Sequence, residues 1–145
     1  GNFDVWAEIN VSDVHSPKKT IFLPQVEHLD LIHRDYPDAT FVLTYRNPDD
    51  WVQSVKKWHS LQEVFINSNI TGLPTGFGKT NEELRSFFVG HSNRIHQFVK
   101  QHPSHTLVEV DIGSKHAGMI LQDAFGVDSK CWGKSNANPT LTLDQ

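Results

Sequence analysis

Residues 40–58, TFVLTYRNPDDWVQSVKKW, decide the fold that this sequence predicts. An apolar run of β type ends at Arg46, and an amphipathic helical pattern begins directly after it. Asn47 is a good helix cap, Pro48 suits the first helical position, and the two aspartates that follow suit the first turn. A strand, a polar corner and a helix in this order form ligand sites in α/β proteins. The corner is therefore predicted to bind an anion.

A serine follows on the same predicted helix. Ser54 stands eight residues after Arg46. At about 100° per residue, it lies about 60° around the helix from Trp51 and about 40° from Trp58. We therefore expect Ser54 to share the inward face with these tryptophans.

A simpler interpretation of the corner stays open at this stage. A capped corner before an amphipathic helix is common. Arg46 would then form a surface ion pair with Asp49 or Asp50, and Ser54 would be a small residue at a helix contact.

Arg-Asn-Pro after an apolar strand, with a serine eight residues beyond the arginine, resembles the 3′-phosphate-binding segment of the sulfotransferases. These enzymes use 3′-phosphoadenosine-5′-phosphosulfate (PAPS). The resemblance implies that Arg46 and Ser54 hold the 3′-phosphate of this co-substrate. The chemistry suits the task, because a guanidinium can grip phosphate through two bonds and a hydroxyl can donate a third.

Other segments resemble the same family in the expected order, over most of residues 20–138. Residues 21–46 resemble the helix and Tyr-Pro turn that lead into the phosphate-binding strand in Golgi-type, bacterial and algal members. Residues 81–112 resemble the family's His-rich helix and the strand that follows it. Residues 117–140 resemble its terminal helix and Asn-containing tail. In the family this tail returns to the 3′-phosphate, which implies binding roles for Lys134 and Asn136.

The family also has a phosphosulfate-binding loop with a lysine near its N-terminus, and no such segment precedes Arg46. We therefore expect residues 1–145 to be the C-terminal larger part of one sulfotransferase-like domain, incomplete at the N-terminus. The cytosolic branch places a catalytic histidine roughly twenty residues before the arginine. Here Glu27 and His28 fall on a predicted helix, so neither is assigned as the general base.

Residues 72–80, GLPTGFGKT, could be mistaken for the missing loop. Their spacing is one residue too long for a phosphate loop, and no strand precedes them. They lie within residues 62–81, which the resemblance identifies as a lid over the acceptor substrate. Lys79 is then interpreted as a solvated loop lysine that could meet an anionic acceptor.

Composition restricts the function classes. A net charge of −4 and the absence of long basic runs argue against a nucleic-acid surface. The single cysteine, Cys131, excludes an intrachain disulfide and a multi-cysteine zinc site. The nine histidines lack the spacing of a zinc-peptidase motif, so we interpret them as scattered surface residues and expect no metal. Two glycosylation sequons, at Asn10 and Asn69, permit a Golgi-lumen or secretory setting, with the cytoplasm as the alternative.

The patterns predict strands at residues 20–23, 40–45 and 106–111, and helices at residues 26–35, 49–61, 82–101 and 115–125. Strands separated by helices imply an α/β fold, with a layered parallel sheet flanked by helices. This agrees with the P-loop NTPase-like sulfotransferase fold, less its first βα unit. Without that unit the sheet would expose an apolar edge, which a protein partner or another segment should cover.

The resemblance implies transfer of a sulfuryl group from PAPS to a hydroxyl or amine acceptor, which can be a carbohydrate, a protein or a small molecule. Two rivals remain. One is a non-catalytic sulfotransferase-like binding or structural subunit. The other is a nucleotide kinase or related phosphate-loop transferase, against which the arginine-to-serine spacing argues.

Overall fold

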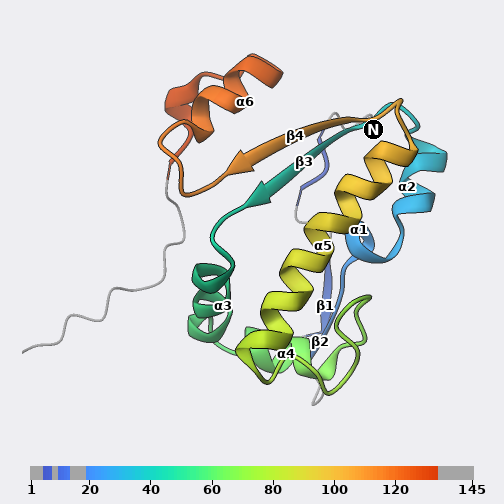
Figure 1. The fold of residues 1–145 in the computed structure, drawn as a ribbon, viewed down its shortest axis with the longest axis vertical. Coiled ribbons are helices and arrows are strands. Elements are labelled where there is room, and N and C mark those ends of the chain that lie inside the picture. Colours follow the sequence, from blue (N-terminus) through green and yellow to red (C-terminus); the bar gives the residue numbers. More distant parts are fainter. Residues whose placement is uncertain (1–4, 8–9, 14–18, 134–145) are drawn as a thin grey trace, which may run out of the picture.

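The computed structural model describes residues 5–7, 10–13 and 19–133 of the 145-residue chain. Its main sheet is a parallel pair of strands, β3 (Thr40–Tyr45) and β4 (Thr106–Asp111), and α5 (Asn81–Gln101) runs beside it (Figure 1). A second pair, β1 (Val11–Asp13) and β2 (Thr20–Phe22), is antiparallel. The predicted α/β class, with a parallel sheet flanked by helices, is confirmed.

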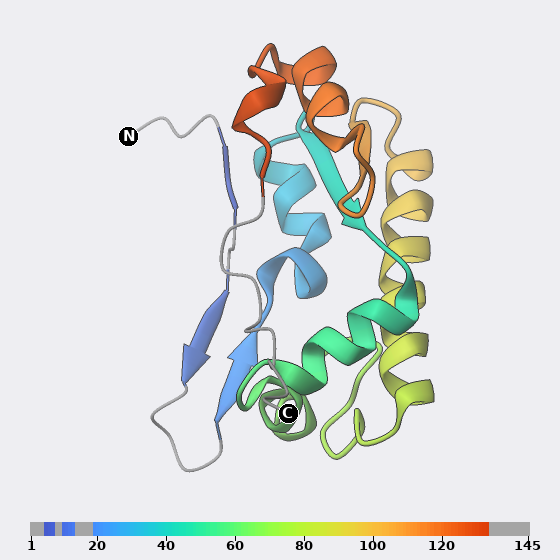
Figure 2. The same cartoon turned by 90° about the vertical axis from the view of Figure 1, so that its left-hand side faces the viewer.

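The remaining helices are α1 (Pro24–Glu27), α2 (Leu29–Asp35), α3 (Pro48–Lys57), α4 (Leu61–Asn67), α6 (Ala117–Phe125) and the short 3₁₀ turn η1 (Ser129–Cys131). Figure 2 shows α6 at one end of the molecule and α3 with α4 towards the other. Among the helices that the structure describes, none is long and apolar enough to cross a membrane.

The register of the parallel pair runs from Thr40 opposite Thr106 to Tyr45 opposite Asp111. Phe41 and Leu43 point to the face that packs against Phe98 of α5, since alternate residues of a strand face opposite sides. Val42 therefore lies on the other face, where 45% of its surface is exposed. An apolar residue of this sheet is thus exposed to solvent. A protein partner that covers it stays a prediction.

Two apolar clusters form the core. One joins α1, α3, α4, the loop after α4 and α5; its buried members are Val26, Val52, Val55, Phe65, Ile70, Leu73, Leu84 and Phe87. The other joins α2, β3 and α5 through Leu29, Leu43, Ile95 and Phe98. Because α5 contributes to both clusters, it fixes the Arg46 corner relative to the loop after α4.

Three predicted elements differ in the structure. The strand at residues 20–22 pairs with β1 and does not join the parallel sheet. The helix predicted at residues 26–35 is interrupted at His28, so that Val26 enters the first core and Leu29 the second. The helix predicted at residues 49–61 ends at Lys57, because the backbone turns to a positive φ of 33° at His59 before α4 begins.

Three histidines lie together at the start of the parallel sheet, so the prediction of scattered surface histidines is wrong for them. His105 is only 5% exposed, and its Nδ1–H donates to the Ala39 carbonyl at 3.0 Å. With that proton on Nδ1, His105 Nε2 accepts from His33 Nδ1–H at 2.9 Å. The His102 ring lies 4.1 Å from the His33 ring, centroid to centroid. These rings tie α2 and the end of α5 to the β3–β4 pair.

This cluster predicts that stability falls as the pH falls. Burial, followed by the charges of His102 and His105, lowers the pKa of His33, and Asp30 opposes this effect. The unfolded chain therefore takes up a proton near the ordinary histidine pKa of about 6.5, before the folded chain does. We expect the free energy of unfolding to decrease as the pH falls from about 7.5 through 6.5. The contribution of His33 to this decrease should end once the pH is below the pKa of His33 in the folded chain.

Urea midpoints at pH 7.5 and 5.5 measure this dependence. A His33→Gln variant should lose part of the difference between the two midpoints. The matched variant His59→Gln, at an exposed histidine, should keep it. An equal difference in wild type and His33→Gln would contradict the assignment.

Candidate functional site

Arg46 lies at the predicted position, between the end of β3 and the start of α3. Asn47 caps the helix, its side-chain oxygen accepting the Asp49 N–H at 2.8 Å, and Pro48 is the first helical residue. Arg46 is half-buried, and its Nε atom is buried without a hydrogen-bond partner among the described residues. A buried guanidinium donor without an acceptor is unfavourable, so an anion that approached the Arg46 guanidinium would be favoured at this corner.

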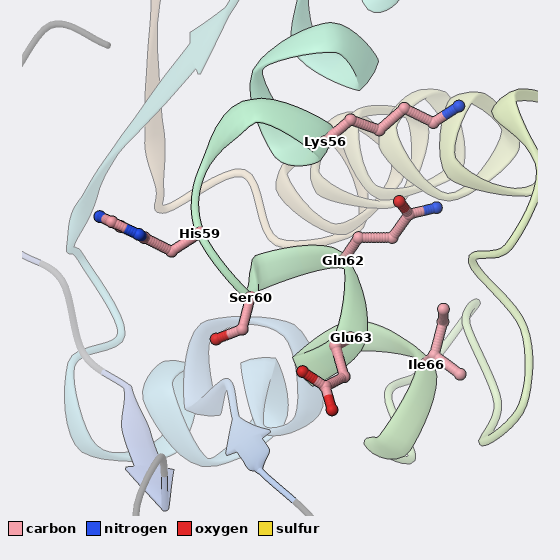
Figure 3. A pocket seen from close by; sticks show the side chains of 6 residues that line it. All are labelled: Lys56, His59, Ser60, Gln62, Glu63 and Ile66. Atoms are coloured by element: carbon pink, nitrogen blue, oxygen red, sulfur yellow. The ribbon is translucent and has the colours of Figure 1, made fainter. Parts of the chain in front are cut away.

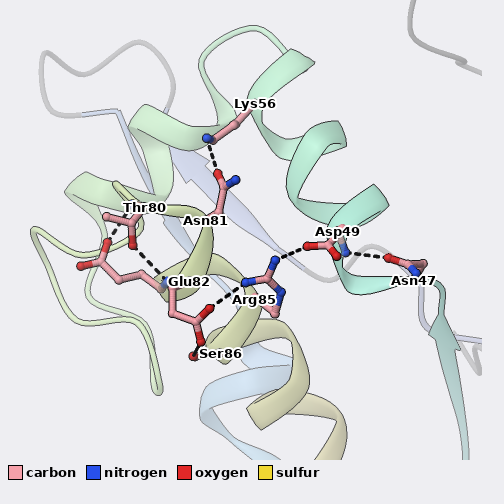
Figure 4. Close-up of polar contacts among 9 residues, drawn as sticks. Asn47, Asp49, Lys56, Thr80, Asn81, Glu82, Arg85 and Ser86 are labelled. Carbon is pink, nitrogen blue, oxygen red and sulfur yellow. Dashed lines mark hydrogen bonds and ion pairs between the residues drawn. The ribbon is translucent and has the colours of Figure 1, made fainter.

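Asp49, one of the two aspartates that could have paired with Arg46, pairs with another arginine. The Asp49 carboxylate pairs with Arg85 of α5, and Arg85 also binds Glu82 at 2.7 Å (Figure 4). The bond to Asp49 is the main cause that raises the pKa of the Arg85 guanidinium. No ion pair of Arg46 is found in the described part of the chain. The simpler interpretation, a surface pair of Arg46 with Asp49 or Asp50, is therefore not what forms.

Ser54 lies on α3 and is half-buried. Within the described residues, its hydroxyl makes no hydrogen bond. Trp51 faces inward as predicted, with its ring 4.9 Å from that of Phe88 and 6.2 Å from that of Phe65. The prediction for Trp58 is wrong: the helix ends one residue earlier, and Trp58 is 44% exposed. Lys134 and Asn136 lie outside the described residues, so their roles stay predictions.

The Gly72–Thr80 segment does not offer its backbone to a phosphate. One carboxylate oxygen of Glu83 accepts the N–H groups of Gly78, Lys79 and Thr80 at 3.1, 2.8 and 3.0 Å. Thr80 completes a capping box at the start of α5. These backbone bonds, that of Thr80 first, lower the pKa of Glu83. The amide groups of this GKT sequence are thus taken by an internal carboxylate, while the Lys79 side chain is exposed.

The predicted lid, residues 62–81, is more ordered than a simple surface excursion. Its first six residues belong to α4, and Ile70 and Leu73 are buried in the first core. The loop is tied to α1 by Glu27, whose carboxylate accepts both the N–H and the hydroxyl of Thr71 at 2.7 and 2.6 Å. Its role over an acceptor stays a prediction.

An open hollow of about 580 Å³ lies beside α4, lined by Lys56, His59, Ser60, Gln62, Glu63 and Ile66. Its polar groups do not converge, since His59 points away from Lys56 and Gln62 (Figure 3). Gln62 donates to the Gly78 carbonyl at 2.9 Å, and Glu63 pairs with Lys19 at 2.9 Å. This hollow is therefore a weaker candidate than the Arg46 corner.

Sequence reasoning missed one arrangement on α5. His91 and Arg94 lie three residues apart beside the predicted lid, where a small cavity separates the helix from the loop. Their spacing indicates one face of a helix and could have been noticed in the sequence. The loop residues across the cavity, Thr71 and Gly72, could not have been identified in that way. No group of three or more His, Cys, Asp or Glu that could hold a metal occurs among the described residues.

Residues 18–74 match the family model described as a sulfotransferase domain. This part of the chain is similar to the sulfotransferase domain. The match includes Arg46 and Ser54 and supports a sulfotransferase-type function in general. It covers about two fifths of the chain, so the resemblance of the later segments stays a prediction. No curated protein and no solved structure matches the chain.

Proposed function

We propose that this sulfotransferase-like protein binds PAPS and transfers its sulfuryl group to a hydroxyl or amine acceptor. Arg46 and Ser54 would hold the 3′-phosphate. One observation carries the proposal: the buried Nε–H of Arg46 has no acceptor, although acidic residues follow it in the next helix.

The charges around the corner suit an anion. The N-terminus of α3 carries a partial positive charge, which favours a phosphate group. Asp49 and Asp50 would oppose it, but the Arg85 guanidinium neutralises Asp49, and Asp50 is exposed, so solvent and salt screen its charge. The Ser54 hydroxyl, on the same helix, has no competing bond among the described residues. These groups fit a phosphate that accepts from a guanidinium and a hydroxyl together.

In this scheme the chain's own residues bind and orient the nucleotide. PAPS supplies the sulfuryl group: the acceptor oxygen or nitrogen bonds to its sulfur, and the sulfur–oxygen bond to the 5′-phosphate breaks. The acceptor's proton leaves to a base that is not assigned. Arg46 would therefore contribute to affinity and orientation, because the 3′-phosphate it holds lies away from the breaking bond. The acceptor, whether carbohydrate, protein or small molecule, stays open.

Calorimetric titration of the full chain with 3′-phosphoadenosine-5′-phosphate (PAP) tests the nucleotide. We expect PAP to bind at least about tenfold more tightly than AMP, which lacks the 3′-phosphate, since one charged hydrogen bond contributes about 1.5–3 kcal/mol. Adenosine 2′,5′-bisphosphate has the same charge as PAP and serves as the matched control. Equal affinity for PAP and AMP would overturn the proposal.

Binding and transfer are separate outcomes. Selective PAP binding without transfer from radiolabelled PAPS to any acceptor would favour the non-catalytic alternative. The Golgi-lumen or secretory setting also stays a prediction. Asn10 and Asn69, the two sequon asparagines, are both exposed, as glycosylation requires.

A further inference from the structure

A small cavity lies between α5 and the loop that follows α4. Its volume is about 150 Å³, and its lining includes Thr71, Gly72, Phe87, Gly90, His91 and Arg94. Arg46 does not line it. Water occupies about 30 Å³ per molecule in the liquid, so a space of this size has room for a small oxyanion such as sulfate.

Arg94 is the cationic residue that lines this cavity. Its Nε atom is buried without a hydrogen-bond partner, and Arg94 makes no ion pair within the described part of the chain. Its closest polar contact is long, from the NH2 group to His91 Nδ1 at 3.4 Å. A guanidinium that is partly desolvated and has no carboxylate partner is stabilised by an anion that accepts its N–H groups.

His91 supplies a second donor. Burial, and then the charge of Arg94, lowers the pKa of His91, so the imidazole is neutral at pH 7. Its Nδ1 faces the Arg94 guanidinium, which can only donate, so Nδ1 accepts and the proton lies on Nε2. A neutral imidazole does not repel Arg94. It leaves one N–H available for a ligand.

Two carboxylates contact the cavity wall, and both have partners: Glu82 pairs with Arg85 and contacts Ser86 of the wall. The Glu27 carboxylate accepts two hydrogen bonds from Thr71, which belongs to the cavity wall. This contact ties the loop to α1, and no carboxylate pairs with Arg94 in the described part of the chain. Gly72, with a φ of 87°, lets the backbone turn beside Phe87.

We propose that this cavity is a second anion site, in which Arg94 and His91 bind a sulfate-sized oxyanion group. The group can be a free ion or a sulfate ester on a larger molecule that enters from the loop side. The site does not depend on the nucleotide proposal, because Arg46 and Arg94 lie on different elements and do not share a cavity.

The test follows the side-chain Nε–H signals of arginine in the ¹⁵N-labelled full chain. Sodium sulfate and sodium methyl sulfate are titrated against sodium chloride at equal ionic strength. We expect a saturable shift of the Arg94 signal with sulfate and no such shift with chloride. Stronger binding of methyl sulfate would indicate an ester group, and stronger binding of sulfate would indicate the free ion.

Two variants separate this site from the rest of the protein. Arg94→Gln should weaken sulfate binding at least about tenfold, whereas Arg34→Gln, at an exposed arginine that pairs with Asp35, should leave it unchanged. The Arg94 signal should still respond in Arg46→Ala, whatever the outcome with PAP. Should Arg94→Gln fail to fold, the wild-type titration decides alone. An Arg94 signal that moves equally with sulfate and chloride would overturn the proposal.

Discussion

Replacing Arg46 with alanine is expected to weaken PAP binding about 100-fold and to leave AMP binding nearly unchanged. The guanidinium can give two charge-assisted bonds to the 3′-phosphate, and each bond to a charged group contributes about 1.5–3 kcal/mol. A loss of about 2.7 kcal/mol corresponds to 100-fold in affinity. Calorimetric titration of the wild type and the variant with both nucleotides measures this difference.

The matched control is Arg34→Ala. Arg34 is an exposed arginine that pairs with its neighbour Asp35 at 2.7 Å, so removing it changes the net charge equally without touching the corner. Ser54→Ala should give a smaller loss of about two- to tenfold, because a neutral hydroxyl bond contributes about 0.5–1.5 kcal/mol. An Arg46→Ala variant that binds PAP like Arg34→Ala does would remove Arg46 from the nucleotide site.

The corner itself could be predicted because its determinants are local. Asn47 caps, Pro48 starts the helix, and the apolar run before Arg46 has the period of a strand, all within a few residues. The partner of Asp49 could not be predicted in this way. Arg85 lies 36 residues further on, and only the packing of α3 against α5 brings it to the helix start.

The interruptions at His28 and His59 escaped prediction for a related reason. Both positions carry residues that helices tolerate, and the apolar spacing continues across them. The chain leaves the helix there because Val26 and Leu29 serve different cores, and because α4 must turn Phe65 back towards Val55. Such choices depend on tertiary packing, which overrides local propensity.

The histidines and Arg94 illustrate the same limit for sites. His33 and His105 are 72 residues apart and meet only because α2 packs beside the start of β4. Likewise, the spacing of His91 and Arg94 indicates one face of α5. It does not indicate that the loop at Thr71 covers that face.

The same substitution, glycine to alanine, is expected to have opposite effects in α5 and α6. Gly90 lies inside α5, and a Cβ there would meet nothing within 4 Å. Gly90→Ala should therefore raise the free energy of unfolding by about 0.5–1 kcal/mol through helix propensity alone. A Cβ on Gly118 would lie 2.6 Å from the Ser129 carbonyl oxygen and 2.9 Å from Trp132 Cβ. Gly118→Ala should lower the free energy of unfolding by about 1–3 kcal/mol.

Urea unfolding of the two variants measures the difference, with unchanged m values as the sign that only stability has moved. Stabilisation in both variants would mean that the segment after α6 does not hold Gly118 closely. The Gly118→Ala variant also tests nucleotide binding by the tail, because residues 129–132 lead directly to Lys134 and Asn136. Gly118→Ala should displace this segment, so weaker PAP binding by the folded variant would support a role for that tail. Unchanged affinity would argue that Arg46 and Ser54 hold the phosphate without it.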